Sequence, residues 1–377
     1  MTNANSRSAA NSLRAQLVPA PEPTGYAQQI ADELIEYLNE WHSLPETWDN
    51  ALDAQIHRWY ADAPKVFPKK PYFSPSSANA CPRELYHKAL GDPRDVTKKP
   101  PYQGRWTRIG TAIGDMIQRD LLFMEKHFEK KVGRPCPFSF ERNPDGTPMF
   151  EDFAKRNHKI ERAGKTFHLF GTCDGIMRYV TEDGEVLRVG LEIKSKQTSA
   201  ARTSFYSLKK PDEKHVKQCV AYAEMYGVDL YVILYVNASK KAWEYEEGEF
   251  EKSPDIRAFG LEIGREDIDV LLDRFVEIQN SIDDGKPMAV DLNGWTFNGY
   301  KTAIAQSLTA AELEDLRDKV SRVKRSNVFD STKRQYHETN HDNYFGCFYE
   351  DGACRKSWKR ERRYLPHWRR HRPRTDQ

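Results

Sequence analysis

Two short segments place acidic side chains and a lysine where they could act together. Asp174 precedes Gly175 at the start of one apolar segment, and Glu192 and Lys194 bracket Ile193 in a second one. If the two segments pair as a hairpin, Asp174 and Glu192 converge at one end of a sheet. Side chains alternate along a strand, so Glu192 and Lys194 share a face. The spacing therefore predicts two carboxylates and an amine at one point of a sheet.

Carboxylates that converge beside an amine suggest a site for a divalent cation. Oxygen ligands of this kind favour Mg²⁺ or Mn²⁺ over zinc. A cation held there lowers the pKa of its bound water and stabilises charge that develops on a phosphate. Lys194 would orient the attacking water and compensate negative charge. The alternative is an ordinary amphipathic hairpin with a surface ion pair between Glu192 and Lys194.

A helical segment downstream carries polar side chains on one face. Residues 212–227 have helical periodicity and end at Gly227, a common type of helix terminator. Gln218 and Tyr222 are four residues apart and share a face, and His215 lies one turn earlier. An amide and a phenol beside an acidic metal site are suited to contact a phosphate or the attacking water. Taken alone, this segment also suits a surface helix with one buried tyrosine.

Together these motifs resemble the PD-(D/E)xK nuclease superfamily, and within it the RecB-like exonucleases. The residues that carry the resemblance are Asp174-Gly175, Glu192-Ile193-Lys194 and Gln218-x-x-x-Tyr222. The N-terminal cysteine motif of the CRISPR-adaptation exonucleases and their phage relatives is similar to Tyr72-x-Ser74-Pro75-Ser76 and Cys81-Pro82-Arg83-x-x-Tyr86. The resemblance covers about residues 72–250 and the C-terminal cysteines.

The resemblance implies a restriction-endonuclease-like α/β fold, in which helices flank a mixed β-sheet. It also implies hydrolysis of DNA phosphodiesters with Mg²⁺ or Mn²⁺. The metal ligands would be Asp174, Glu192 and the backbone carbonyl of Ile193. The residues with catalytic roles would be Asp174, Glu192, Lys194, Gln218 and Tyr222.

One position departs from the family pattern. The first core helix of these nucleases usually supplies a histidine ligand in a Gly-x-x-x-His pattern. Here Gly110 is followed four residues later by Gly114, and Asp115 comes next. Asp115 or Gln118 substitutes, or the site manages without this ligand. We favour the last, because a shift of one residue turns a helical side chain by about 100°. The departure leaves the number of metals open.

The cysteines suggest a second metal site. Six cysteines are too few and too widely spaced for the disulfide framework of a secreted protein, so they favour a reduced intracellular compartment. They are Cys81, Cys136, Cys173, Cys219, Cys347 and Cys354. Cys81, Cys347 and Cys354 resemble the iron–sulfur staple of AddB-type nucleases, with His341 in place of the fourth cysteine. The prediction is a 4Fe–4S cluster or, with the same ligands, a zinc site. The remaining alternative is three unligated thiols.

A net charge of +2 hides a basic C-terminal segment. Residues 355–377 hold ten Lys or Arg and two acidic residues, whereas the rest of the chain has 48 basic and 54 acidic residues. A cationic tail on an acidic body suits a polyanion such as DNA, and the alternative is a solubilising tail. The predicted DNA contacts are Arg83, Lys196, Lys359, Arg360, Arg362 and Arg363.

Length and composition bound the domain organisation. A chain of 377 residues can hold one large domain or two modest ones, and 30% charged residues with a mean hydropathy of −0.79 indicate long solvated helices. The expected segments are a disordered leader (1–25), an N-terminal helical segment (26–70), a nuclease core (71–260), a helical segment (261–330) and a cysteine-containing region with the basic tail (331–377).

Hydrophobic periodicity predicts the elements that position the motifs. Helices are expected at residues 26–42, 105–131, 212–227, 264–284 and 309–325, with a helical patch around 81–90. Strands are expected at residues 166–170, 173–180, 185–193 and 230–236, with 242–250 as the antiparallel neighbour of the last. The sequence Glu182-Asp183-Gly184 marks a hairpin turn. This order predicts an α/β protein in which helices cover a mixed sheet.

The favoured function is a metal-dependent exonuclease acting on DNA ends in recombination, repair or phage DNA metabolism. A recombinase, an annealing protein or a helicase is the expected partner, in the cytoplasm of a bacterium or a phage-infected host. The first 21 residues lack acidic side chains, so mitochondrial targeting is an alternative. Gly114 favours a second hypothesis, a catalytically weak single-stranded-DNA-binding protein. A third is a structure-specific endonuclease of the same fold, since a fold does not determine a substrate. No membrane association is expected, because no segment approaches the ~20 apolar residues of a membrane helix.

Overall fold

The structure, a computed structural model, describes residues 25–95, 100–291 and 298–315. Its contacts divide the chain into two units. The first unit is Met1–Asn79 with Thr97–Gly285, and the second is Ala80–Val96 with Lys286–Gln377. This division differs from the boundaries expected from the sequence, because the N-terminal helix and residues 261–285 belong to the same unit as the predicted core. Among the described helices, none is both long and apolar enough to cross a membrane.

The first unit contains a five-stranded sheet with strand order β2-β5-β6-β7-β8. Its strands are β2 (Phe138–Phe140), β5 (Gly175–Val180), β6 (Val186–Lys196), β7 (Leu230–Asn237) and β8 (Ile256–Glu262). β6 and β7 are parallel, and the other neighbours are antiparallel. The predicted restriction-endonuclease-like class, a mixed sheet flanked by helices, is confirmed by this topology.

The hairpin that joins β5 to β6 is the one predicted from the sequence. Val180 pairs with Val186, and Gly184 in the turn has a φ of 82°. A positive φ favours glycine, so the Glu182-Asp183-Gly184 sequence closes the turn at the expected place. The register continues to the pair Gly175–Leu191 at the other end of the hairpin. This register determines which residue of β6 lies beside the residue that precedes Gly175.

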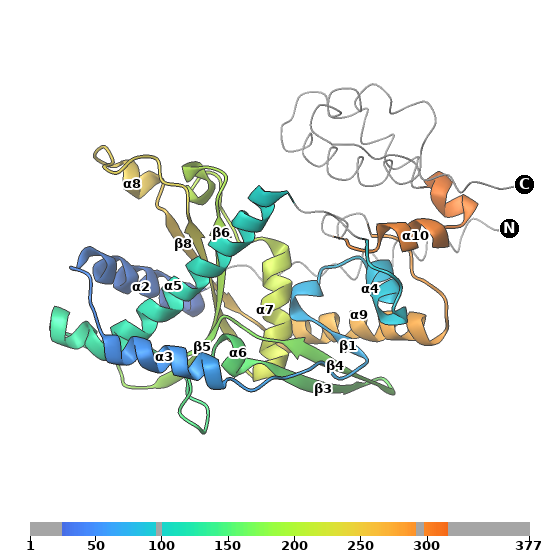
Figure 1. Cartoon of the computed structure of the whole chain (residues 1–377), viewed down its shortest axis with the longest axis horizontal. Helices are drawn as coiled ribbons and strands as arrows, with labels where there is room; N and C mark the ends of the chain where they lie inside the picture. Colours follow the sequence, from blue (N-terminus) through green and yellow to red (C-terminus); the bar gives the residue numbers. More distant parts are fainter. Residues whose placement is uncertain (1–24, 96–99, 292–297, 316–377) are drawn as a thin grey trace, which may run out of the picture. The chain divides into compact units, whose positions relative to one another are not determined.

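Helices cover both faces of the five-stranded sheet (Figure 1). On one face lie α2 (Gly25–Ser43), α3 (Asn50–Asp62) and α5 (Pro101–Val132), and their apolar side chains form one cluster with alternate residues of the central strands. On the other face lies α7 (Glu213–Tyr226), which packs on β6 and β7. The side chain of Asp212 accepts a hydrogen bond from the Lys214 amide at the start of α7. Gly227, with a φ of 62°, ends the helix as predicted.

A smaller three-stranded sheet has the order β1-β4-β3. It consists of β1 (Tyr72–Phe73), β4 (Lys165–Gly171) and β3 (Arg156–Arg162), and η1 (Pro75–Ser77) follows β1. The strand predicted at 166–170 therefore exists, but it belongs to this sheet and not to the one that holds β5 and β6. The ring of Phe73 stacks at 4.5 Å on Phe275 of α9 (Arg265–Asp283), the helix expected at 264–284.

The prediction that residues 242–250 pair with β7 is wrong. Part of that segment is the short helix α8 (Glu249–Lys252), and Trp243 is 99% exposed. β8 takes the place beside β7, with Ile256, Ala258 and Phe259 buried. The alternation of aromatic and acidic residues before α8 imitates a strand pattern, but its acidic side chains would be costly to bury against a sheet.

The second unit contains α4 (Pro82–Leu90) and α10 (Lys301–Ser307), which pack on each other. α4 is the helical patch expected around 81–90. Residues 310–315 are helical, and the rest of the helix expected at 309–325 lies outside the described residues.

Candidate active site

Asp174 and Glu192 lie side by side because of the hairpin register. β5 begins at Gly175, which pairs with Leu191 of β6, so the residues just beyond this pair are Asp174 and Glu192. The backbone amide of Ile193 donates a hydrogen bond of 2.6 Å to Oδ2 of Asp174. Asp174 is therefore held just before the start of β5 by the strand that carries Glu192.

Lys194 and Glu192 share one face of β6. Glu192 is 1% exposed, and the ammonium group of Lys194 contacts its Oε1. Among the described residues, Glu192 Oε2 has no hydrogen-bond partner. A buried carboxylate without full hydrogen bonding is costly, and a positive charge placed beside it would offset this cost.

The electrostatics of the site follow from this burial. Burial and the charge of Asp174 raise the pKa of Glu192 to about 8, despite the opposing effect of Lys194. Burial also raises the pKa of Asp174 above its usual range. Burial alone would lower the pKa of Lys194, but the charges of Glu192 and Asp174 outweigh it and raise that pKa. At neutral pH Lys194 is therefore a charged donor and not a base.

Helix α7 connects Lys194 to the loop that carries Asp174. Lys194 Nζ donates a hydrogen bond of 3.2 Å to Oε1 of Gln218. The amide of Gln218 donates to the hydroxyl of Tyr222 at 3.1 Å, and this hydroxyl donates to the carbonyl of Thr172. The structure thus brings both predicted α7 residues to the site, where they position Lys194 and the residues before Asp174.

His215, one turn before Gln218, does not contact the carboxylates. Its Nδ1 lies 2.8 Å from the hydroxyl of Tyr235 on β7. Burial, followed by the charge of Lys194, lowers the pKa of His215. The imidazole of His215 is therefore neutral near pH 7, and its contact is with Tyr235 of β7.

Gln118, one of the predicted substitutes for the family histidine, and Glu151, which the sequence analysis did not assign, lie close to Asp174. Gln118 of α5, 1% exposed, donates hydrogen bonds to the Asp174 carbonyl at 2.8 Å and to Oε1 of Glu151 at 3.5 Å. The backbone amide of Glu151 donates to the Cys173 carbonyl at 3.1 Å, and the hydroxyl of Thr172 donates to the Glu151 carbonyl. The loop around Glu151 is therefore joined to the Asp174 loop through its backbone and side chain.

Glu151, at the first position of α6 (Glu151–Ala154), is a third carboxylate at this end of the sheet. Burial, then the charge of Asp174, raises its pKa to about 7. Its φ is 45°, in the left-handed region that non-glycine residues adopt at a cost of roughly 1–2 kcal/mol. No periodic pattern marks Glu151 in the sequence, so only the tertiary contact with Asp174 reveals it.

Helix α5 carries Gly114, Asp115 and Gln118, the positions considered for the expected histidine ligand. A Cβ added to Gly114 would meet no atom within 4 Å, so this position contributes no ligand and leaves open space. Asp115 is exposed, and Gln118, one turn after Gly114, is the residue that contacts Asp174. Of the two predicted substitutes, Gln118 reaches the site, and as an amide it positions Asp174 through hydrogen bonds.

The chemistry of the donors suits one divalent cation. Among the residues that the structure describes, no three His, Cys, Asp or Glu side chains meet as a ready metal-binding group. The oxygen donors present are the carboxylates of Asp174 and Glu192. The carbonyl of Ile193 points to the same side of β6 as the amide of Ile193, which donates a hydrogen bond to Asp174. One of these oxygen atoms, Oε2 of Glu192, is buried and has no hydrogen-bond partner among the described residues. This set of donors suits Mg²⁺ or Mn²⁺.

The predicted DNA contacts have different surroundings. Lys196 is half-buried, with its ammonium group 4.7 Å from the centre of the Tyr235 ring, and burial lowers its pKa. Arg83 is 1% exposed inside the second unit, where it binds the carbonyl of Ser307 at 2.6 Å and the carboxylate of Glu312 at 2.6 Å. Its burial argues against the predicted DNA contact and assigns it to the packing of α4. The others lie outside the described residues, namely Lys359, Arg360, Arg362 and Arg363.

Of the predicted staple ligands, the structure describes only Cys81. It is buried at the start of α4, and the Asp291 amide donates to its Sγ at 3.3 Å. Burial raises the pKa of the Cys81 thiol. His341, Cys347 and Cys354 lie outside the described residues.

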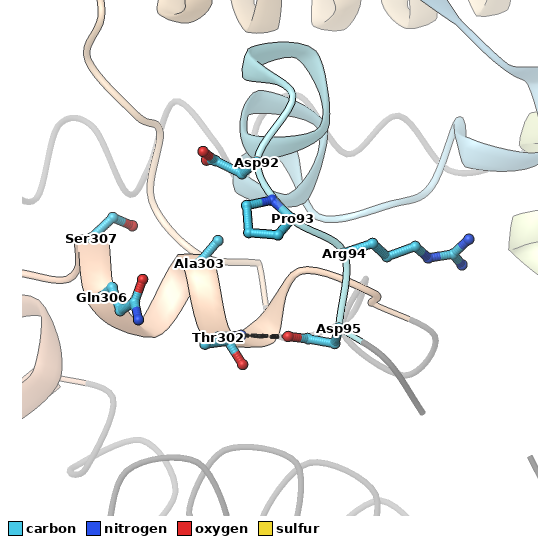
Figure 2. Close-up of a pocket in the computed structure, with 8 residues that line it drawn as sticks. All are labelled: Asp92, Pro93, Arg94, Asp95, Thr302, Ala303, Gln306 and Ser307. Atoms are coloured by element: carbon cyan, nitrogen blue, oxygen red, sulfur yellow. Dashed lines mark hydrogen bonds between the residues drawn. The ribbon is translucent and has the colours of Figure 1, made fainter. Parts of the chain in front are cut away.

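The second unit contains a cavity of about 450 Å³ near α10 (Figure 2). The carboxylate of Asp95 accepts hydrogen bonds from the first amides of this helix, at Lys301 and Thr302. Nδ1 of His87 lies 2.6 Å from Asp92, and its Nε2 lies 3.0 Å from the hydroxyl of Ser307. These contacts join α4 to α10, and none of the predicted catalytic residues lines this cavity.

Comparisons with known proteins give no family by sequence. No protein-family model matches the chain, and no curated protein matches it. Three solved structures are similar over part of the chain. The protein named SSO0001 has 11% identity, covering 68% of this chain and 95% of its own, with a TM-score of 0.35. An alkaline exonuclease from Laribacter hongkongensis has 11% identity, covering 60% and 95%, with a TM-score of 0.33. A phage-related exonuclease from Haemophilus somnus has 15% identity, covering 55% and 81%, with a TM-score of 0.29.

Proposed function

We propose that this chain is a divalent-metal-dependent DNA exonuclease whose site is built by Asp174, Glu192 and Lys194. The observation that carries the proposal is the convergence of a buried carboxylate (Glu192), a half-buried one (Asp174) and a charged lysine at the start of β5. A structural ion pair needs one carboxylate, and a second beside it is electrostatically costly, which favours a functional role for the pair.

The reaction proposed is hydrolysis of a phosphodiester. A water molecule attacks the phosphorus, a new P–O bond forms, and the bond to the leaving sugar oxygen breaks as that oxygen takes up a proton. A divalent cation held by Asp174, Glu192 and the Ile193 carbonyl would supply an activated water and stabilise the developing charge. The Lys194 ammonium, aligned by Gln218, donates a hydrogen bond to the nucleophile or to a phosphate oxygen. Tyr222 and Gln118 keep Asp174 in place through its neighbouring carbonyls.

A requirement for DNA ends distinguishes an exonuclease from an endonuclease of the same fold, and cleavage itself distinguishes it from a DNA-binding protein. With Mn²⁺, the protein is expected to release nucleotides from linear DNA and to leave covalently closed circular DNA intact, and EDTA should stop the reaction. Gel analysis of both substrates in parallel measures this outcome. Cutting of the circle would indicate an endonuclease of the same fold. Salt-dependent binding to linear DNA without cleavage would indicate a DNA-binding protein, the alternative favoured by the absence of a side chain at Gly114.

We also propose that Cys81 is one ligand of an iron–sulfur or zinc staple with Cys347, Cys354 and His341. What supports the proposal is the position of Cys81, which is buried at the start of α4 in the second unit with the Asp291 amide donating to its Sγ. Anaerobically purified full-length protein is expected to absorb at roughly 400 nm, and Cys81→Ser should remove this absorption. Colourless protein with one bound zinc per chain would identify the zinc form. Protein without bound iron or zinc would contradict the staple.

A further inference from the structure

The first part of α5 exposes a row of large apolar side chains. Tyr102, Trp106 and Ile109 are 60%, 46% and 44% exposed. Their spacing of four and three residues places them on one side of the helix. Further along α5, Ile117 and Leu121 are almost completely buried in the core. Along its length the helix thus changes from an exposed element to a core one, and its exposed part carries apolar side chains that no described residue buries.

The same stretch is basic. Residues 101–114 include Arg105 and Arg108, both exposed, and no acidic residue. Single exposed apolar residues are normal on a protein surface, whereas a contiguous group rimmed by charge marks a binding surface. We call the surface formed by Tyr102, Trp106 and Ile109 with the two arginines the α5 face.

The α5 face is joined to the catalytic strand. The amide of Gln197, three residues after Lys194, donates a hydrogen bond of 3.1 Å to the carbonyl of Trp106. At Gly110 the helix passes so close to β6 that an added Cβ would lie 3.3 Å from Oγ of Ser195. One helix therefore carries the exposed aromatic residues in its first turns and, near its middle, Gln118, which contacts Asp174.

The length of the helix sets the scale of the ligand. Trp106 and Gln118 are twelve residues apart, which corresponds to about 18 Å along a helix axis. At about 3.4 Å per nucleotide along one strand this span corresponds to roughly five nucleotides, within the about 4–16 nucleotides that one binding fold holds. Gln118 lies on a different side of α5 from Tyr102, Trp106 and Ile109, so a strand bound to the α5 face would pass around the helix to reach the site.

We propose that the α5 face holds an unpaired DNA strand, and that the substrate is single-stranded DNA or a single-stranded overhang. This inference rests on the proposed nuclease function. Unpaired bases present the flat surfaces that stack on Tyr102 and Trp106, whereas the bases of a duplex are stacked on each other. Arg105 and Arg108 neutralise the phosphates between the stacked bases. A protein partner could also contact the aromatic residues. It would not account for the absence of acidic residues from 101–114, on the same helix as Gln118, which contacts Asp174 of the proposed cleavage site.

Binding measurements in an Asp174→Asn background separate the inference from catalysis. The probes are a fluorescent single strand of about 20 nucleotides and the blunt duplex of the same sequence. Replacing Tyr102 and Trp106 together with alanine is expected to weaken single-strand binding by about tenfold or more, because stacking contributes about 1–3 kcal/mol per base. Tyr102→Phe with Trp106→Phe should retain most of the affinity. Trp48→Ala, which removes a 74% exposed tryptophan outside α5, is the matched control and should change nothing.

A second readout tests the arginines. Replacing Arg105 and Arg108 with glutamine should reduce the slope of log Kd against log salt concentration by about 1.4, roughly 0.7 for each phosphate that is no longer neutralised. An unchanged slope would contradict the assignment of the arginines to the phosphates.

The results that would overturn this inference differ from the results that would contradict the nuclease proposal. Unchanged single-strand affinity in the double alanine variant, or an equal loss for single strand and blunt duplex, would overturn it. A changed oligomeric state with unchanged DNA affinity would assign the α5 face to a second copy of the chain. If the unaltered protein binds the single strand through the α5 face but does not cleave it in Mn²⁺, the nuclease proposal fails and the α5 face stands.

Discussion

Replacing Lys194 with methionine or Asp174 with asparagine is expected to slow nucleotide release from linear DNA by at least about 10²–10³-fold. Lys194→Met keeps the aliphatic stem but removes the ammonium group that contacts Glu192 and Gln218. Asp174→Asn keeps an oxygen that can accept from the Ile193 amide but removes the charge that would hold a cation. Initial rates at saturating Mn²⁺ measure the effect.

Both variants are expected to remain folded, which makes a loss of activity interpretable. Asp174→Asn removes a negative charge that raises the pKa of the buried Glu192 and whose own ionisation is disfavoured by burial, so its melting temperature should equal or exceed that of the unaltered protein. Lys159→Met, on an exposed lysine of β3, is the matched control and should retain full activity. Full activity in both site variants would contradict the assignment of the site.

Gly260→Ala is expected to reduce the free energy of unfolding by about 3 kcal/mol, near the upper end of the usual cost of overpacking. Gly260 lies in β8, where α2 crosses the sheet. A Cβ there would lie 2.0 Å from the carbonyl carbon and oxygen of Ala27 and 2.3 Å from the Gln28 nitrogen. These are backbone atoms, so the clash cannot be relieved by turning a side chain, and α2 must move away from the sheet. Its fully buried Leu34 would then lose part of its packing.

Thermal unfolding followed by circular dichroism measures this effect. For a domain of this size a loss of about 3 kcal/mol corresponds to a fall in melting temperature of roughly 10 °C. Gly104→Ala is the matched control, because a Cβ in this helical position meets only the end of the Arg108 side chain at 3.9 Å. It should be neutral or slightly stabilising. Equal melting temperatures for the two variants would show that α2 does not pack closely on β8.

The parts of the site that the sequence predicts are those encoded by local patterns. The β5–β6 hairpin follows from alternation and from a turn that ends in Gly184, and the register of that hairpin brings Asp174 to Glu192. The face of α7 that carries Gln218 and Tyr222 follows from helical spacing and from Gly227 at its end. Each of these signals lies within a few residues of the feature that it determines.

The parts that the sequence could not predict depend on contacts between distant segments. Glu151 reaches Asp174 through an irregular loop, and no spacing relates the two residues in advance. Arg83 has the charge of a surface residue, and only the packing of α4 shows that it is buried. The segment 242–250 resembles a strand as well as β8 does, and the difference is which of them can bury its side chains against β7 and α2.

The discontinuous second unit has a consequence for how the protein is made. Its first segment, Ala80–Val96, leaves the ribosome before the segment that begins at Lys286, and roughly 190 residues lie between them. At a synthesis rate of about 5–20 residues per second, α4 therefore waits roughly 10–40 seconds for α10. During this interval Cys81 and the apolar side of α4 are exposed to solvent, oxidants and chaperones, while most of the first unit is already being completed. Synthesis rate and thiol chemistry in the cell thus bear on the yield of this protein.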